Sequence, residues 1–421
     1  MVTQPYDKIS PAMQQAYYQR SPYNLVRIIL GLPELFDAEP GENVYRRAAR
    51  DFKEWREQGI LIQEKEPCIF AYSQQFKVPG TEVVKERRGF IALGKLHDYA
   101  EQVVFRHEHT LSQPKADRLN LLNATRAHFG QIFMLYSDPA ASVDAILYDN
   151  NGSPEVEVTD EYDVLHRLWR VSDPPTIRLL TTAMADKKLI IADGHHRYET
   201  ALNYAKARAH VSTAPAEHST NRLPQPEYPE AAVMMTFVNM DSDGLVVLPT
   251  HRVVHSFPEF DPAAFVRASE DLFKTTPLTE TQTEDWISAL AAQEDTAFIA
   301  VTRSGPFLMR LKPEAASALT ESLPQHQRQL DLCNLHALVL DRLLGIDAEK
   351  IREETANIRY LRDAEEAVDQ VRRGEADVAF LMKPVAIEQL REVAFAGAVM
   401  PQNSTDFYPK LLSGLTIYAL E

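Results

Sequence analysis

The sequence predicts an α+β protein with a mixed-sheet N-terminal lobe and a smaller α/β C-terminal lobe. Three observations support this fold class. The chain has 421 residues, and at roughly 150 residues per domain this length suggests two or three domains. Short apolar runs typical of strands alternate with amphipathic stretches typical of helices. The composition changes near residue 260, so we expect one lobe over residues 1–260 and a second over residues 261–421.

The first third of the chain alternates helical and extended segments. Residues 43–61 space their apolar side chains along one helix face, and Gly59 is well placed to end that helix. "CIFAYSQQF" (68–76) and "RRGFIALGKL" (87–96) predict strands, because a turn-forming Pro-Gly segment separates two runs of strand-forming residues. The apolar run "QIFMLYSD" (131–138) predicts a further buried strand.

The middle of the chain continues this pattern. "DVLHRLWRVSD" (163–173) predicts a strand, followed by a helix that begins at Pro174 or Pro175. A second strand, "KKLIIAD" (187–193), leads into the helix "HHRYETALNYAKARAH" (195–210). The proline-rich stretch 211–230 contains few apolar residues, so we expect an irregular loop there.

The remaining segments complete the predicted sheets. "AAVMMTFVNM" (231–240) and "LVVLPTHRVVHSF" (245–257) predict strands joined by the turn "DSDG". In the C-terminal lobe we expect a hairpin around Ser304 and Gly305, and an amphipathic helix over "DLCNLHALVLDRLLGI" (331–346). Residues 363–397 then alternate helix, strand and helix.

Composition limits the classes of function. The chain has 60 Asp and Glu against 44 Lys and Arg, a net charge of -16. This balance argues against a general nucleic-acid-binding surface, which needs clustered Lys and Arg. Only Cys68 and Cys333 occur, which excludes a disulfide framework and a thiolate metal site. The sequence shows no secretory signal and no apolar run near ~20 residues, so we expect a cytoplasmic protein without a membrane partner.

The densest group of potentially cationic side chains lies between the strand 187–193 and the helix 195–210. The inward face of that helix is expected to contain Tyr198, Ala201, Leu202 and Ala205. A helix N-terminus is a site of positive potential, and arginine can clamp an anion while histidines add directed donors. The turn therefore predicts a phosphate or carboxylate site formed by Asp193, Gly194, His195, His196 and Arg197. We expect Asp193 to be the N-cap of the helix. A metal ion bound through one histidine, or a solvated helix start, are the alternatives.

A second polar motif, "HEHTLSQPKADR" (107–118), combines the residue types that phosphoryl transfer needs. We assign Glu108 as the preferred general base, with His107 and His196 as further catalytic candidates. Lys115 and Arg118 are candidates for phosphate binding, and Asp117 and Asp193 for holding Mg²⁺. The alternative is a solvated turn and helix face.

Two further segments could contribute to a site. "LPTHRVV" (248–254) places His251 and Arg252 within an apolar strand, where their side chains point to opposite faces, so at most one of them lines a given pocket. We include both as phosphate-binding candidates. The alternative is that they are surface residues with a structural role. In "MPQNSTDFYPKLLSGL" (400–415), Lys410 could reach a phosphate as a flexible point charge, against a turn whose hydroxyls bond local backbone.

The motifs resemble a known protein family in their order along the whole chain. "PYDKIS", "SPYNLVRIILGLPE", "HEHTLSQPKADRLNLL", "IFMLYSD", "HRLWRV", "IADGHHRYETALNY", "LPTHRVV" and "MPQNSTDFYPKLLSGL" follow the pattern of the bacterial and archaeal family named domain of unknown function 1015. The family name implies no activity. This chain departs from the pattern at Asn403, where the family has lysine, and at Asp406, where it has an aromatic residue.

A shorter resemblance carries more chemistry. The strand–Asp-Gly-His-His-Arg–helix stretch is similar to the phosphate-binding turn of the ParB and sulfiredoxin superfamily, which includes free serine kinases. The resemblance implies that Gly194, His195, His196 and Arg197 hold the phosphates of a nucleotide, ATP or ADP, with Mg²⁺. We therefore expect a nucleotide-binding enzyme that transfers phosphate to a small metabolite, such as the hydroxy amino acid serine. A nucleotide-gated regulatory or DNA-associated protein, and a hydrolase of a phosphorylated or carboxylated substrate, are the alternatives.

Overall fold

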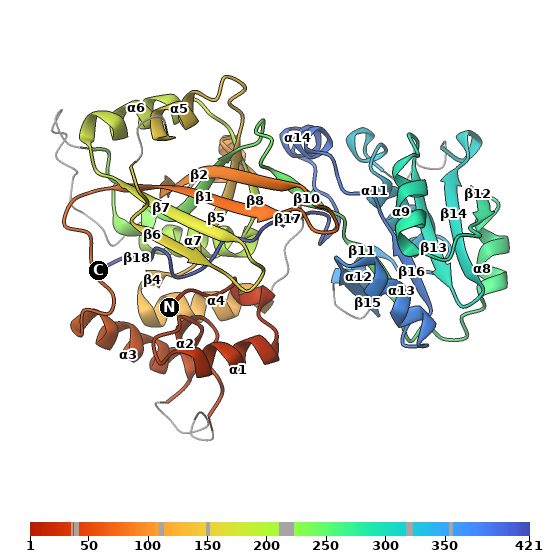
Figure 1. The fold of residues 1–421 in the computed structure, drawn as a ribbon, viewed down its shortest axis with the longest axis horizontal. Coiled ribbons are helices and arrows are strands. Elements are labelled where there is room, and N and C mark those ends of the chain that lie inside the picture. The colour runs from red at the N-terminus through yellow and green to blue at the C-terminus, as the bar shows by residue number, and fades with distance from the viewer. Residues whose placement is uncertain are drawn as a thin grey trace. The chain divides into compact units, whose positions relative to one another are not determined.

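The computed structural model describes residues 1–34, 37, 42–108, 113–148, 152–209, 223–316, 323–352 and 357–421. It divides into two compact units (Figure 1). Unit 1 contains Met1–Phe105, Thr110–Val246 and Pro409–Glu421, and unit 2 contains Arg106–His109 and Val247–Tyr408. The chain therefore leaves unit 1 well before residue 260 and returns to it near the C-terminus. A single boundary at residue 260 does not describe this arrangement, because each unit is assembled from segments distant in sequence.

Unit 1 is built on a mixed sheet, as the sequence predicts. The described strands lie in the order β3-β8-β5-β9-β2-β1-β7-β6. The pairs β3/β8 and β5/β9 are parallel, and the others are antiparallel. The bounds are β1 Ile69–Lys77, β2 Val84–Lys95, β3 Val104–Phe105, β5 Ile132–Tyr136, β6 Val156–Thr159, β7 Leu165–Val171, β8 Leu189–Asp193 and β9 Ala232–Asn239.

Helices cover this sheet and bury its central strands. Every residue of β5 and β9 is buried, which explains their continuous apolar runs. In Figure 1, α5 and α6 lie above the sheet and α4 lies below it. Side chains of α5, α6 and α7 all join the main core of the unit. The helices of unit 1 with described bounds are α1 Pro11–Arg20, α2 Val26–Ile29, α3 Val44–Glu57, α4 Gln113–Thr125, α5 Ser142–Tyr148, α6 Pro174–Met184 and α7 His195–Arg208.

Local sequence signals explain where several of these helices begin and end. Asn43 accepts a hydrogen bond from the Arg46 amide at the start of α3, and Gly59 follows its end with φ +70°, as predicted. Asp173 caps α6, which begins at Pro174 as the sequence indicates. The predicted end of α3 and the predicted start of α6 are therefore confirmed.

The N-terminal and C-terminal segments meet within unit 1. Thr3 and Ser413 form an antiparallel bridge through both main-chain hydrogen bonds, at 3.0 and 2.9 Å. The strand β18, Tyr418–Ala419, pairs with β4, Ala127–His128, directly after α4. Nothing in the local sequence predicts either pairing, because both join residues that are far apart along the chain.

Unit 2 contains a sheet in the order β12-β14-β13-β16-β11-β15. Its described strand pairs are all antiparallel, whereas the α/β arrangement expected for this lobe implies parallel pairs. The predicted hairpin is confirmed, with Gly305 at φ +117°. The strand bounds are β11 His251–Val254, β12 Phe273–Pro277, β13 Ala297–Thr302, β14 Gly305–Leu311, β15 Ile358–Leu361 and β16 Val378–Leu381.

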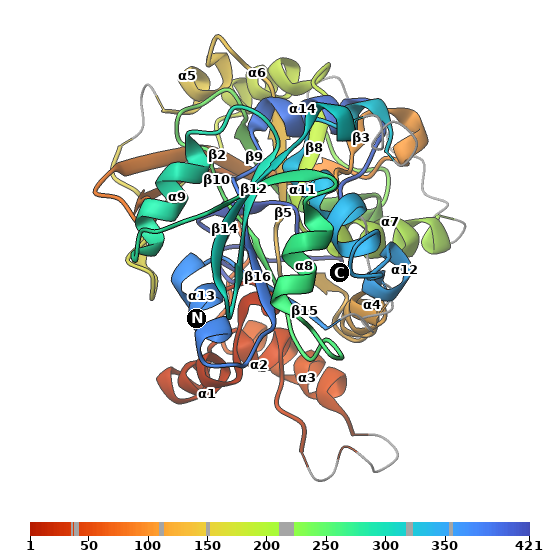
Figure 2. The same cartoon turned by 90° about the vertical axis from the view of Figure 1, so that its right-hand side faces the viewer.

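Two helix layers cover this second sheet. Figure 2 shows α9 and α13 on one side of the strands and α8 on the other, and each side has its own apolar core. Residues 363–397 form helix, strand and helix, as predicted. The bounds are α8 Pro262–Ser269, α9 Thr283–Ala291, α13 Ala364–Arg372 and α14 Ile387–Phe395.

Three sequence-based expectations need correction or completion. The strand expected over 245–257 is two strands, because Pro249 interrupts it: β10, Val246–Leu248, pairs with β17, Asp406–Tyr408, whereas β11 belongs to the large sheet. The helix expected over 331–346 is α11, Asp331–Asn334, followed by a π-helical stretch, Leu335–Asp341. Most of the predicted loop 211–230 lies outside the described residues. Among the described helices, none has the length and apolar character needed to span a bilayer.

Candidate anion-binding site

The basic turn lies where β8 joins α7 in unit 1. Asp193 is the last residue of β8, and Gly194, with φ +94°, is the N-cap of α7. The predicted Asp193 N-cap is therefore wrong: among the described residues no side chain forms a capping hydrogen bond to this helix, and the Asp193 carboxylate instead lies 3.4 Å from Arg197 Nη2. The first N–H groups of a helix have no partner within the helix, so this end carries positive potential.

The inward face of α7 fixes the position of the turn. Tyr198, Ala201, Leu202 and Ala205 are all buried, which confirms the predicted helix face. The Tyr198 hydroxyl donates to the His97 carbonyl at 2.8 Å and accepts from the His97 amide at 2.9 Å. The helix start therefore rests on a packed and hydrogen-bonded base.

Arg197 occupies a slot between two glycines. Its Nη1 donates to the Gln131 carbonyl at 2.5 Å. A Cβ atom on Gly130 would lie 3.0 Å from Arg197 Nη1, and one on Gly194 would lie 3.1 Å from Arg197 Nε. Larger residues at either position would crowd the guanidinium. These contacts hold the Arg197 side chain in place. The side chain is 15% exposed, so it still reaches the surface.

Positive charge gathers around Asp193. Burial alone would raise the pKa of this carboxyl, but the charges of Lys410, Arg197, Lys8 and His195 lower it below its usual range. Asp193 is therefore influenced by four groups that are cationic or can become so, of which Lys8 also pairs with the Asp7 carboxylate at 3.9 Å. An environment with excess positive charge at a helix N-terminus favours an anionic ligand.

Two of these cations come from the segments that meet at the chain ends. Lys8 lies in the motif "PYDKIS" but is not among the predicted site residues, and Lys410 is expected only as a flexible point charge. Tyr6 links a further candidate to the turn: the Arg118 guanidinium lies 4.0 Å from its ring centroid. Burial raises the pKa of Tyr6, and the charges of Arg197, Arg118 and Asp193 also act on it.

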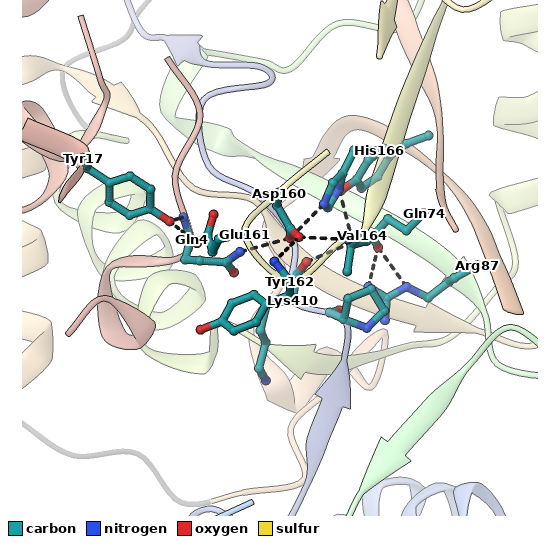
Figure 3. A network of polar contacts seen from close by, with 12 residues as sticks. Gln4, Tyr17, Gln74, Arg87, Asp160, Glu161, Tyr162, Val164, His166 and Lys410 are labelled. Atoms are coloured by element: carbon teal, nitrogen blue, oxygen red, sulfur yellow. Dashed lines mark hydrogen bonds and ion pairs between the residues drawn. The ribbon is translucent and has the colours of Figure 1, made fainter. Parts of the chain in front are cut away.

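A buried network holds the main chain at Lys410 (Figure 3). Gln74 Nε2 donates to the Lys410 carbonyl at 2.9 Å. Arg87 Nε donates to Gln74 Oε1 at 3.0 Å, and Arg87 Nη2 donates to the Pro409 carbonyl at 2.5 Å. Gln74 and Arg87 are each 1% exposed, and the Arg87 guanidinium lies over the Phe133 ring. The backbone that carries the Lys410 side chain is therefore rigidly placed.

The same network reaches the N-terminal segment. His166 Nε2 lies 3.1 Å from Asp160 Oδ2, and His166 Nδ1 lies 2.7 Å from the Tyr72 hydroxyl. The Gln4 amide donates to the same Asp160 oxygen at 3.1 Å. Burial lowers the pKa of His166, although Asp160 opposes this shift. A neutral His166 donating through Nε2 satisfies both contacts, and Gln4 anchors the segment that leads to Lys8.

Four predicted site residues, His107, Glu108, His251 and Arg252, belong to unit 2, and three of them lie around one loop. Glu108 Oε1 accepts hydrogen bonds from the Ser404 amide at 3.0 Å, and from the Thr405 amide and hydroxyl at 2.9 and 3.0 Å. His107 Nε2 lies 2.8 Å from the same Thr405 hydroxyl. The buried Arg252 donates to the Asn403 carbonyl at 2.9 Å. The structure thus brings Glu108, His107 and Arg252 to one loop of unit 2.

The same segment contains Asn403 and Asp406. Asn403 adopts φ +53°, a conformation that asparagine tolerates better than most residues. Asp406 forms an ion pair with Arg362, so its carboxylate is used within unit 2. His251, the neighbour of Arg252, is 1% exposed and accepts from the Met382 amide at 3.1 Å through Nδ1. Burial lowers the pKa of His251 to about 4.

The carboxylates considered for Mg²⁺ do not form a metal centre. Asp117 accepts from Arg118 Nε and from the Tyr45 hydroxyl, both at 2.8 Å. Asp193 lies among cations that compete with a metal ion. In the part of the chain that the structure describes, no group of three or more His, Cys, Asp or Glu side chains could hold a metal. These residues therefore do not fit a protein-built Mg²⁺ site. The side chain of Lys115 lies outside the described residues.

The solved structures that the chain matches include a free serine kinase in complex with AMP. That match has 12% sequence identity and a TM-score of 0.36, and covers 79% of this chain and 92% of the kinase. A conserved hypothetical protein from Pyrococcus furiosus matches at 10% identity with a TM-score of 0.35, over 77% and 92% of the two chains. SbnI from Staphylococcus aureus, truncated at its C-terminus, matches at 10% identity with a TM-score of 0.34, over 77% and 85%.

No curated protein matches the chain. A family model does: it is described as "Protein of unknown function (DUF1015)" and matches residues 1–358. This match covers most of the sequence, so the chain belongs to that family.

Proposed function

We propose that unit 1 binds the phosphate groups of a nucleotide at the β8–α7 turn. The observation that carries this proposal is the excess of positive charge around Asp193, supplied by Lys8, His195, Arg197 and Lys410. Phosphate carries more negative charge than a carboxylate, so it gains most from several cations and a helix N-terminus.

The residues around Asp193 have different roles in this proposal. Arg197, fixed between Gly130 and Gly194, offers a guanidinium of defined orientation. Lys8 and Lys410 act as point charges, which suit a ligand whose phosphates vary in number or position. Asp193 stays ionised near neutral pH because its pKa is lowered, so it serves as the counter-ion that keeps these cations in place and cannot accept a proton as a base.

The reaction that we propose is transfer of phosphate to a small metabolite, a hydroxy amino acid such as serine. Phosphoryl transfer depends mainly on positioning and on offsetting the charge of the phosphates, and the cations of unit 1 are suited to that task. Glu108 belongs to unit 2, and its role as the general base stays a prediction. The same holds for His107 and His196 as catalytic residues, and for His251 and Arg252 as phosphate ligands.

Calorimetric titration with ATP and with tripolyphosphate tests the binding step. Lys8→Met and Lys410→Met each remove one positive charge from the surroundings of Asp193. Each variant should bind both compounds about tenfold more weakly, a loss on the order of the free energy of one charge-assisted hydrogen bond. Lys53→Met is the matched control, because Lys53 is an exposed residue of α3 that pairs with Glu57. Equal affinities for all four proteins would contradict the proposal.

Turnover then separates an enzyme from a binding protein. Release of ADP from ATP that depends on an added hydroxy amino acid would support the kinase. Tight ATP binding without turnover would instead favour the nucleotide-gated regulatory protein.

A further inference from the structure

A cavity lies beside Arg197 in unit 1, and neither the sequence motifs nor the proposed phosphate site uses it. Its volume is about 60 Å³. By this measure one water needs roughly 10–15 Å³, so the cavity has room for about four to six waters. It lies between α4, β4 and α7, and Arg118 and Arg197 are among its lining residues. A group bound there would therefore lie next to a ligand held at the turn.

The lining of the cavity is mainly apolar and aromatic. Tyr6, His128 and Phe129 contribute rings, and leucine side chains of α4 and Val233 of β9 contribute aliphatic surface. No carboxylate occurs among the described lining residues. Burial lowers the pKa of His128 to about 4, so its imidazole is neutral near pH 7. With two arginines and no described carboxylate in its lining, the cavity is suited to a flat group without positive charge rather than to an ammonium group.

One polar atom in the cavity wall lacks a partner. Thr200 is 6% exposed, and its Oγ1 makes no hydrogen bond to any described residue. Helical threonines commonly donate to the carbonyl four residues earlier, and Thr181 does so to Ile177 at 2.8 Å. A buried hydroxyl without a partner is costly and calls for an explanation, such as a ligand or water. Thr200 lies three residues after Arg197, on the same side of α7.

We propose that this cavity receives the base of the nucleotide whose phosphates bind at the turn. A nucleobase is flat and uncharged, stacks on aromatic rings, and presents donors and acceptors at its edge. Thr200 Oγ1 and the neutral His128 can pair with that edge. An amino acid would leave its ammonium group without a counter-ion among the described lining residues.

This inference rests on the proposed function and goes beyond it, because it places the base and names the ligand class. It makes the affinity for ATP depend on residues that the affinity for tripolyphosphate does not involve. Both compounds carry three phosphates, but only ATP carries a base. The two titrations therefore separate the cavity from the phosphate site.

Thr200→Val removes the hydroxyl at nearly constant volume. It should weaken ATP binding about 3–10-fold, the range of one lost hydrogen bond, and leave tripolyphosphate binding unchanged. Thr200→Ser retains the hydroxyl and is the matched control, with affinities close to wild type. Ala201→Leu places a larger side chain against the cavity and should weaken ATP binding at least about tenfold, again without effect on tripolyphosphate. Melting curves show whether each variant is folded, and the Val and Ser pair suffices if Ala201→Leu is not.

Two results would overturn the inference while the phosphate site stands. In the first, wild type binds ATP no more tightly than tripolyphosphate. In the second, Thr200→Val leaves ATP binding unchanged, or lowers the affinity for both compounds equally. Failure of the wild type to bind either compound would instead contradict the proposed function, and the inference with it.

Discussion

The side-chain amide of Gln74 holds the main-chain carbonyl of Lys410 at 2.9 Å in the interior of unit 1. Gln74 also supplies the acceptor for Arg87 Nε. A central strand of the sheet is thereby tied to the segment that carries one of the cations around Asp193. This contact makes the anion site sensitive to a residue in the middle of β1.

Gln74→Leu should destabilise unit 1 and weaken tripolyphosphate binding together. The substitution leaves Arg87 Nε and the Lys410 carbonyl without their partners, at a cost of about 1–3 kcal/mol for each buried group. Chemical denaturation and calorimetry measure the two effects. Gln75→Leu is the control, because Gln75 is the exposed neighbour on the opposite face of β1. Similar losses in both variants would show that the buried contact has no special role.

Asp193→Asn should strengthen tripolyphosphate binding, on the order of tenfold at low salt, because it removes the negative charge among the cations. A carboxylate that held Mg²⁺ would give the opposite result with Mg²⁺ and ATP. The depressed pKa of Asp193 also stabilises the fold above about pH 4, its unfolded value, and this contribution is lost as the pH falls toward the lower folded value. The stability difference between wild type and variant should therefore shrink below about pH 4.

His251→Asn should make unit 2 less sensitive to acid. The pKa of His251 is about 4 in the fold and about 6.5 when unfolded. Between these values the unfolded chain binds more protons, so wild-type stability falls as the pH is lowered. Asn retains an acceptor for the Met382 amide and has no proton to bind. Unfolding free energies from pH 7 to pH 4 should show a shallower slope for the variant, and an unchanged slope would refute the assignment.

Glu108→Gln tests the general base. If the carboxylate accepts the proton of the acceptor hydroxyl, turnover should fall about 10²–10⁴-fold while ATP affinity stays near wild type. Thr405→Val is the companion variant, because it removes one hydrogen bond to Glu108 and keeps the carboxylate. Equal effects of both variants on turnover and on the stability of unit 2 would show that Glu108 only holds the loop around Ser404.

The sequence predicts elements better than it predicts their assembly. The helix ended by Gly59, the helix that begins at Pro174 and the hairpin at Gly305 are all confirmed, since each depends on a local signal of capping, proline or turn chemistry. The division into units was not predictable in this way. It depends on pairings such as Thr3 with Ser413, which join residues that no local pattern connects.

The candidate site shows the same limit. Asp193, His195 and Arg197 are adjacent in sequence, so a motif reveals them together. Lys8 and Lys410 reach the same carboxyl only through the fold. Neither lysine differs in local context from a surface lysine. The buried polar residues that place Lys410, such as Arg87, occur within an otherwise ordinary strand.

The discontinuity of unit 1 has a consequence for biosynthesis. Residues 409–421 belong to unit 1, but the whole of 247–408 precedes them in the chain. A ribosome must therefore complete the synthesis of unit 2 before the segment with Lys410 emerges. N-terminal domains usually fold first during synthesis, but the site in unit 1 can be completed only after unit 2 has been synthesised. A nascent chain stalled before residue 409 lacks Lys410, so the cation cluster around Asp193 is incomplete until the end of synthesis.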